Sequence, residues 1–155
     1  MRGELVTSLA AAPRMLERLL RVFPADRLDD KIPGAQLTPR QTVASLAASE
    51  TLVLERIRLA NTHPGSAVDS IDAFQLALQN KNAKDIFLEA EVFESRRLMT
   101  VEYLQSLHDL DWSKTLILSG IAVTLGDYVG LILSNDLMHL DEMTRPLAAE
   151  VATIS

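Results

Sequence analysis

The stretch LTPRQTVASLAASE, residues 37–50, carries the clearest helix-start signal in the chain. Thr38 can cap a first turn, the proline after it suits the first helical position, and Gln41 can complete a capping box. The predicted helix runs to about Ala60, because the THPG of residues 62–65 then supplies a stop.

Three further segments carry apolar residues at the three- and four-residue spacing of amphipathic helices. They cover about residues 4–22, a stretch from the NAKD of residues 82–85 to Leu107, and a stretch from the TLGD of residues 124–127 to near Pro146. Asn82 and Thr124 are the expected caps of the last two. No stretch shows the sustained alternation of a strand, so an all-α fold is predicted.

The connections between these helices differ in length. About twenty residues separate the second helix from the third, and they are predicted to hold a short helical piece around residues 67–78. A connection of this length can cross the bundle, so helices two and three are expected to run parallel. The sequence therefore predicts one domain over residues 1–155, a four-helix bundle with a long crossover.

Composition excludes several classes of function. The net charge is −6, and the arginines are scattered, with Arg96 and Arg97 interpreted as part of a solvated helix face. No basic surface for nucleic acid is therefore expected. The apolar run at residues 117–133 is short for a membrane span and contains Asp127, so it is interpreted as a loop leading into a buried helix. The chain has no cysteine, which fits a cytoplasmic protein and excludes thiolate chemistry.

The candidate site lies on the second and fourth helices. In SNDLMHLDEM, residues 134–143, Asn135 and His139 are four residues apart, a spacing that suits two imidazoles on one metal ion. At 100° per residue they share a stripe with Tyr128 and are expected to face inward or into a groove. On the second helix, Ser45 and Ser49 form a small polar stripe.

Glu50 stands among apolar residues of the second helix. It is therefore the carboxylate expected to be buried, with a perturbed pKa. Pairing with an arginine, or capping of a polar network, is favoured over a catalytic role.

Three stretches together resemble the DinB-like (damage-inducible) superfamily of four-helix bundles. They are LTPRQTVASLAASE, then IDAFQLALQNKNAKD followed by LQSLHDLDW, and finally VTLGDYVGLILSNDLMHLDEM. The resemblance implies an up-down-down-up bundle and, in many members, a divalent metal held by three histidines. By position these ligands fall on Ser45, Asn135 and His139, and only His139 is kept. Relatives include thiol-dependent transferases and isomerases, and they often form homodimers.

Ser45 is a poor neutral donor, and the Asn135 carbonyl suits hard cations such as Ca²⁺ or Mg²⁺. A site for Zn²⁺, Ni²⁺ or Mn²⁺ is therefore disfavoured. An ordinary hydrogen-bonded pair of His139 with Asn135 is favoured over a metal site, and no cofactor is expected. The favoured function is binding of a small molecule, or regulation, at a groove between the second and fourth helices, without a membrane partner. The groove would be lined by Ser45, Ser49, Glu50, Tyr128, Asn135 and His139.

Two alternatives stay open, and whether the chain is an enzyme is open with them. One is a metal-dependent enzyme of the thiol-transferase type with a rearranged site that uses His139, Asn135 and Glu50. The other is an interaction protein that acts as a homodimer.

Overall fold

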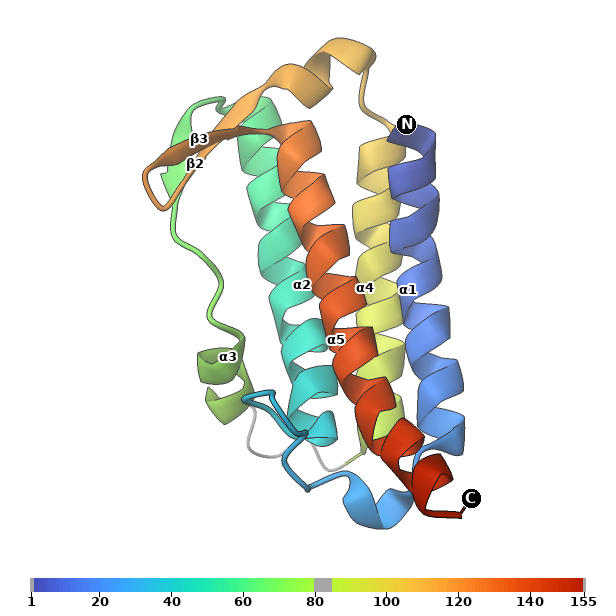
Figure 1. Cartoon of the computed structure of the whole chain (residues 1–155). Coiled ribbons are helices and arrows are strands. Elements are labelled where there is room, and N and C mark those ends of the chain that lie inside the picture. The colour runs from blue at the N-terminus through green and yellow to red at the C-terminus, as the bar shows by residue number, and fades with distance from the viewer. Residues whose placement is uncertain (1, 80–84, 155) are drawn as a thin grey trace.

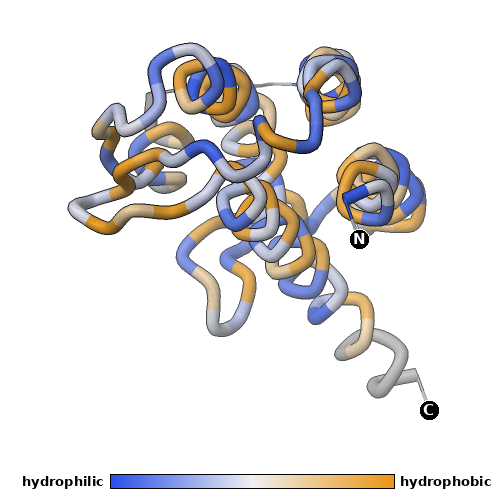
Figure 2. The backbone as a smooth tube through the Cα atoms, turned by 90° about the horizontal axis from the view of Figure 1, so that it is seen from above, coloured by the Kyte–Doolittle hydropathy of each residue, from blue (hydrophilic) through white to orange (hydrophobic). Residues whose placement is uncertain are grey.

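Four long helices make up the bundle in the computed structural model, which describes residues 2–79 and 85–154 (Figure 1). They are α1 (Arg2–Val22), α2 (Pro39–Thr62), α4 (Ile86–Gln105) and α5 (Leu125–Ile154). Helices α1 and α5 run in one direction and α2 and α4 in the other. The predicted up-down-down-up bundle is therefore confirmed. Seen from above, the helices surround a shared interior, with the strands and the short helix of the crossover at one side (Figure 2).

The long crossover joins the parallel helices α2 and α4. It holds a short strand, β1 (Ser66–Val68), and a two-turn helix, α3 (Ala73–Gln79), which packs against α2. The short helix predicted around residues 67–78 thus exists but begins later, because the strand takes its first part. Asn82, the cap expected for the next helix, lies outside the described residues. Asp85 caps α4 by accepting hydrogen bonds from the amides of Phe87 and Leu88 at 3.0 and 3.2 Å.

The helix starts predicted at Thr38 and Thr124 are confirmed. Thr38 Oγ1 accepts from the amide of Gln41 at 3.2 Å, and Gln41 Oε1 accepts from the amide of Thr38 at 3.0 Å. Thr124 Oγ1 accepts from the amide of Asp127 at 3.1 Å at the start of α5. The predicted end near Pro146 is wrong, since α5 continues to Ile154. A proline costs a helix one hydrogen bond and some bending, and the alanine-rich residues after it favour continuation.

A small sheet, absent from the prediction, sits beside α2. Strands β2 (Thr115–Leu118) and β3 (Ile121–Thr124) form a hairpin, and β1 pairs with β2 in parallel. The two turn residues, Ser119 and Gly120, have φ of 48° and 85°, as a type I′ turn requires. Each strand has only three or four residues, too few for a detectable alternating pattern. The interpretation of residues 117–124 as loop is therefore wrong.

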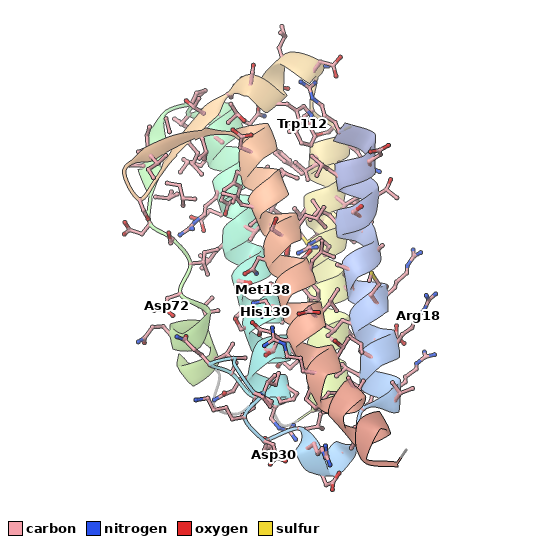
Figure 3. The ribbon with its side chains drawn as sticks, viewed as in Figure 1. Arg18, Asp30, Asp72, Trp112, Met138 and His139 are labelled. Atoms are coloured by element: carbon pink, nitrogen blue, oxygen red, sulfur yellow. The ribbon has the colours of Figure 1, made fainter. Side chains whose placement is uncertain are left out.

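The core falls into two clusters, one at each end of the bundle. The first gathers around Leu9, Ile57, Leu104 and Val129, and includes Trp112, which follows α4 in the 3-10 helix η2 (Asp109–Ser113). Figure 3 shows Trp112 beside the start of α1. The second cluster contains Leu16, Leu20, Ile32, Val43, Leu46, Ala47, Ile86, Ala90, Phe93, Leu140 and Met143. None of the described helices is long and apolar enough to cross a membrane.

Candidate functional site

Three charged side chains are buried between the two core clusters. Arg97 on α4 is 2% exposed, Glu50 on α2 is 1% exposed, and Asp136 on α5 is 2% exposed. On each helix the charged residue lies between residues of the first cluster and residues of the second. We call Glu50, Arg97 and Asp136 the buried triad. It links three of the four bundle helices at mid-height.

The Arg97 guanidinium is the hub of the buried triad. Its Nε donates to both Glu50 oxygens, at 2.8 and 3.0 Å. Its Nη1 and Nη2 donate to the two Asp136 oxygens at 2.6 and 3.0 Å, in the fork geometry that favours arginine over lysine. Nη1 also donates to the carbonyl of Leu9 on α1 at 3.0 Å. Arg97 therefore contacts all three of the other long helices.

Electrostatics of the triad follow from one cation facing two acids. Burial raises the pKa of Glu50 above its usual value of 4.5, and the nearby Asp136 adds to this, while Arg97 and the hydroxyl of Thr100 oppose it. Burial alone would lower the pKa of Arg97, but hydrogen bonds to Asp136 and Glu50 outweigh that effect and raise it. With both carboxylates ionised, the triad holds one excess negative charge. Arg97 is thus permanently charged and Glu50 is the member whose charge is costly.

The sequence predicted part of the triad. Glu50 is buried and paired with an arginine, as expected. The interpretation of Arg97 as a solvated residue is wrong, because its side chain is buried. The neighbouring Arg96 is half-buried. A signal was present: the buried residues of α4 recur at steps of three and four, and position 97 falls on that stripe between Phe93 and Thr100.

A cavity of about 160 Å³ lies between α2 and α5. Its walls are largely apolar, and Ser70, Ile71 and Leu118 from the crossover and the hairpin cover it. The small sheet therefore has a structural role at the site. The lining residues are Ser45, Leu46, Ser49, Glu50, Val53, Arg56, Ser70, Ile71, Ala73, Arg97, Leu118, Tyr128, Leu131, Ile132, Asn135 and Asp136.

Most of the polar lining comes from α2 and α5. Ser45, Ser49 and Arg56 lie on α2 with Glu50, and Tyr128 lies opposite on α5. The Tyr128 hydroxyl is buried and makes no hydrogen bond of standard length and angle to the described residues. Burial raises the pKa of Tyr128, the charge and hydrogen bonding of Arg56 oppose that shift, and the negative charge of Glu50 adds to it. A hydrogen-bonding phenol and a guanidinium thus stand on facing helices.

Of the three positions that the resemblance implies for a metal, Ser45 and Asn135 line the cavity and His139 does not. Ser45 is buried in the cavity wall, and Asn135 lines the same cavity at its exposed edge, so Asn135 faces a groove, which is one of its two expected placements. His139 is buried on α5 but does not line the cavity. Its Nδ1 has no hydrogen-bond partner among the described residues, and lies 3.6 Å from Glu142 Oε2. The favoured hydrogen bond between His139 and Asn135 is therefore absent.

The donor set does not fit a bound transition metal. Such a site needs three or four imidazole, thiolate or carboxylate donors around one point. Within residues 2–79 and 85–154, no three histidine, aspartate or glutamate side chains are grouped to hold an ion. The two carboxylates nearest the cavity, Glu50 and Asp136, already accept from Arg97. A guanidinium is thus the cation that these acids bind.

Removal of the Arg97 side chain is expected to destabilise the folded protein severely. Arg97→Met leaves two buried carboxylates without a cation, so the free energy of unfolding should fall by about 3–5 kcal/mol, measured by urea denaturation. The triple variant E50M/R97M/D136L removes all the charges and should recover most of the loss. Arg96→Met is the control and should cost no more than about 1.5 kcal/mol, because Arg96 makes one hydrogen bond to a backbone carbonyl. Equal losses in R97M and R96M would contradict a central role for Arg97.

The raised pKa of Glu50 predicts a pH dependence of stability. The folded state holds the Glu50 proton more tightly than the unfolded state, so its contribution is complete below about 4.5 and is lost as the pH rises through the folded pKa. The free energy of unfolding of the native protein, minus that of Glu50→Gln, should therefore decrease as the pH rises from 4 to 8. Glu55→Gln, on the exposed face of the same helix, controls for the change in net charge. A difference that grows with pH would show that Arg97 lowers the Glu50 pKa instead.

Comparison with known proteins gives a family and a fold. The model of the DinB superfamily matches residues 8–143. No protein in the curated set matches the sequence significantly. The fold is similar to that of YfiT from Bacillus subtilis, described as a probable metal-dependent hydrolase with an unusual four-helix bundle topology. The TM-score is 0.85 at 19% identity, over 95% of this chain and 87% of YfiT.

A second solved structure is the mycothiol-dependent maleylpyruvate isomerase, with a TM-score of 0.74 at 13% identity. The match covers 94% of this chain but 61% of the isomerase, so this chain spans less than two thirds of that protein. At these identities the two structures establish the shared fold alone. The family model, however, covers most of the chain, and the chain belongs to the DinB superfamily.

Proposed function

We propose that this protein is a small-molecule-binding or regulatory module whose ligand occupies the cavity between α2 and α5. The observation that carries the proposal is the cavity itself, about 160 Å³ of largely apolar space with a few polar groups along it. Small-molecule sites typically have this composition, because apolar walls supply affinity and a few polar groups fix orientation. The buried triad forms part of the wall, so a network of hydrogen bonds that joins the four long helices supports the site.

The size of the cavity limits the ligand. An apolar cavity of about 150 Å³ accommodates benzene. The cavity here is close to that volume, so it suits a single ring or a short branched chain. A larger ligand would have to extend past the edge at Asn135, which is exposed.

Benzyl alcohol tests whether the cavity binds a ligand. Titration followed by amide NMR shifts should show saturable, roughly millimolar binding, with the shifts centred on the lining residues of α2 and α5. Ser49→Leu places a bulky side chain at the half-buried edge of the cavity and should weaken binding at least tenfold.

Ser8→Leu is the matched control, because Ser8 is exposed on α1 and does not line the cavity. Its affinity for benzyl alcohol should stay within twofold of the native value. Absence of saturable binding to the native protein would contradict the proposal. Equal affinities of S49L and S8L would contradict it as well.

A metal-dependent enzyme of the thiol-transferase type is the alternative. It would require Ser45, Asn135 and His139 to be rearranged, with Glu50 as a further donor, and Glu50 would first have to leave Arg97. The favoured proposal holds that the histidine triad of the family has been lost from this chain. Homodimer formation and a cytoplasmic location remain predictions from the resemblance and the composition.

Metal analysis separates the two proposals. Protein purified without a histidine tag should contain substoichiometric metal and should bind Zn²⁺, Ni²⁺ and Mn²⁺ no more tightly than its His139→Ala variant does. Stoichiometric metal that is lost in H139A would favour the metal-dependent alternative.

A further inference from the structure

The cavity contains one cation with no acid opposite it. Arg56 lines the cavity, is half-buried, and has no carboxylate within 4 Å among the described residues. Several other basic side chains in the described ranges are paired: Arg2 with Asp109, Arg21 with Glu17, Arg40 with Asp29, Arg97 with the triad acids, Lys114 with Asp111 and Arg145 with Asp141. A half-buried guanidinium beside apolar walls is costly without an anion, so its position calls for a partner.

A second hydrogen-bonding group faces Arg56. The Tyr128 hydroxyl, on the opposite helix, is buried and makes no hydrogen bond of standard length and angle within the described residues, while the Arg56 guanidinium approaches it as a hydrogen-bond donor. Tyr128 is only 3% exposed, and buried hydroxyls normally find a partner. Arg56 acts on Tyr128 electrostatically, so the two groups serve one region of the cavity.

The two carboxylates that line the cavity make the electrostatic character of its two ends different. Glu50 and Asp136 already accept from Arg97, and their negative charge disfavours an anion near them. On α2, Glu50 and Arg56 are six residues apart, about 9 Å along the helix axis. An anionic ligand would therefore place its charge near Arg56 and its apolar part against the walls formed by Val53, Ile71, Leu118 and Ile132.

We propose that the ligand is a compact monocarboxylate, with its carboxylate bound by Arg56 and Tyr128 and its single-ring or branched apolar body in the cavity. This inference rests on the proposed function and names its ligand class. Guanidinium and phenol are both hydrogen-bond donors, and the planar guanidinium matches a carboxylate in two-point geometry. A cationic ligand would instead meet Arg56 with the same charge.

Phenylacetate and phenylacetamide test the inference, because they share shape and differ in charge. Titrations by calorimetry and amide NMR at pH 7 and low salt should give a dissociation constant at least tenfold lower for phenylacetate. Arg56→Gln should reduce that preference to less than twofold while leaving phenylacetamide binding nearly unchanged. Arg56→Lys should retain part of the preference, because lysine keeps the positive charge but cannot bind a carboxylate in the two-point geometry of a guanidinium.

Arg58→Gln is the matched control. Arg58 is two residues away on α2 but stacks on the Tyr103 ring outside the cavity, so R58Q should keep the tenfold preference. Equal binding of the two compounds to the native protein, or an unchanged preference in R56Q, would overturn the inference. If phenylacetamide still binds and Ser49→Leu blocks it, the proposed cavity function survives that result. Failure of both compounds to bind would overturn the function and the inference together.

Discussion

The bundle depends on one guanidinium at its centre. Arg97 reaches the carboxylates of α2 and α5 and a backbone carbonyl of α1 from its own position on α4. A buried ion pair adds little net stability over apolar packing, but loss of one partner is very costly. Arg97 also lies 4.8 Å over the ring of Phe93, which joins the charge to the second core cluster. The triad therefore specifies which helix faces meet, while the two apolar clusters supply most of the favourable free energy.

The triad also determines the character of the neighbouring cavity. Glu50 and Asp136 line it, yet their oxygens are engaged by Arg97 and are not open to a metal ion. Two further polar groups of the lining, Arg56 and Tyr128, lie on the facing helices α2 and α5, and neither has a carboxylate partner among the described residues. The end of the cavity at the triad thus carries excess negative charge, and the end at Arg56 carries a positive charge without a carboxylate partner among the described residues. That asymmetry is the physical basis for expecting an oriented, anionic ligand.

Periodicity and capping chemistry were enough to predict the bundle, because its helices are long and Thr38 and Thr124 begin two of them with standard caps. The hairpin was missed because its strands are too short to show alternation, although the Ser119–Gly120 pair is a recognised turn signal. The continuation past Pro146 was missed because a single proline is a weak stop when the following residues favour helix.

The site was predicted only in part, because its main contacts join residues that are far apart in the sequence. Glu50 was identified from its apolar neighbours, but Arg97 was taken for a surface residue, since arginine is seldom buried unless it is paired. Its partners come from positions 47 and 39 residues away, and no local pattern reveals such pairs. Asn135 and His139 share a helix stripe in sequence, yet one is exposed and the other buried, because burial depends on which distant segments pack over each turn of α5.

The central claim is that Arg97 is a buried, immobile, ion-paired hub. NMR of the arginine side chains tests it most directly, in ¹⁵N-labelled protein with Arg97→Lys used to assign the signal. The account predicts separate, slowly exchanging Nε and Nη proton signals for Arg97, shifted by the two carboxylates and unchanged by added Zn²⁺. A single averaged signal that exchanges as rapidly as those of exposed arginines such as Arg18 would contradict it.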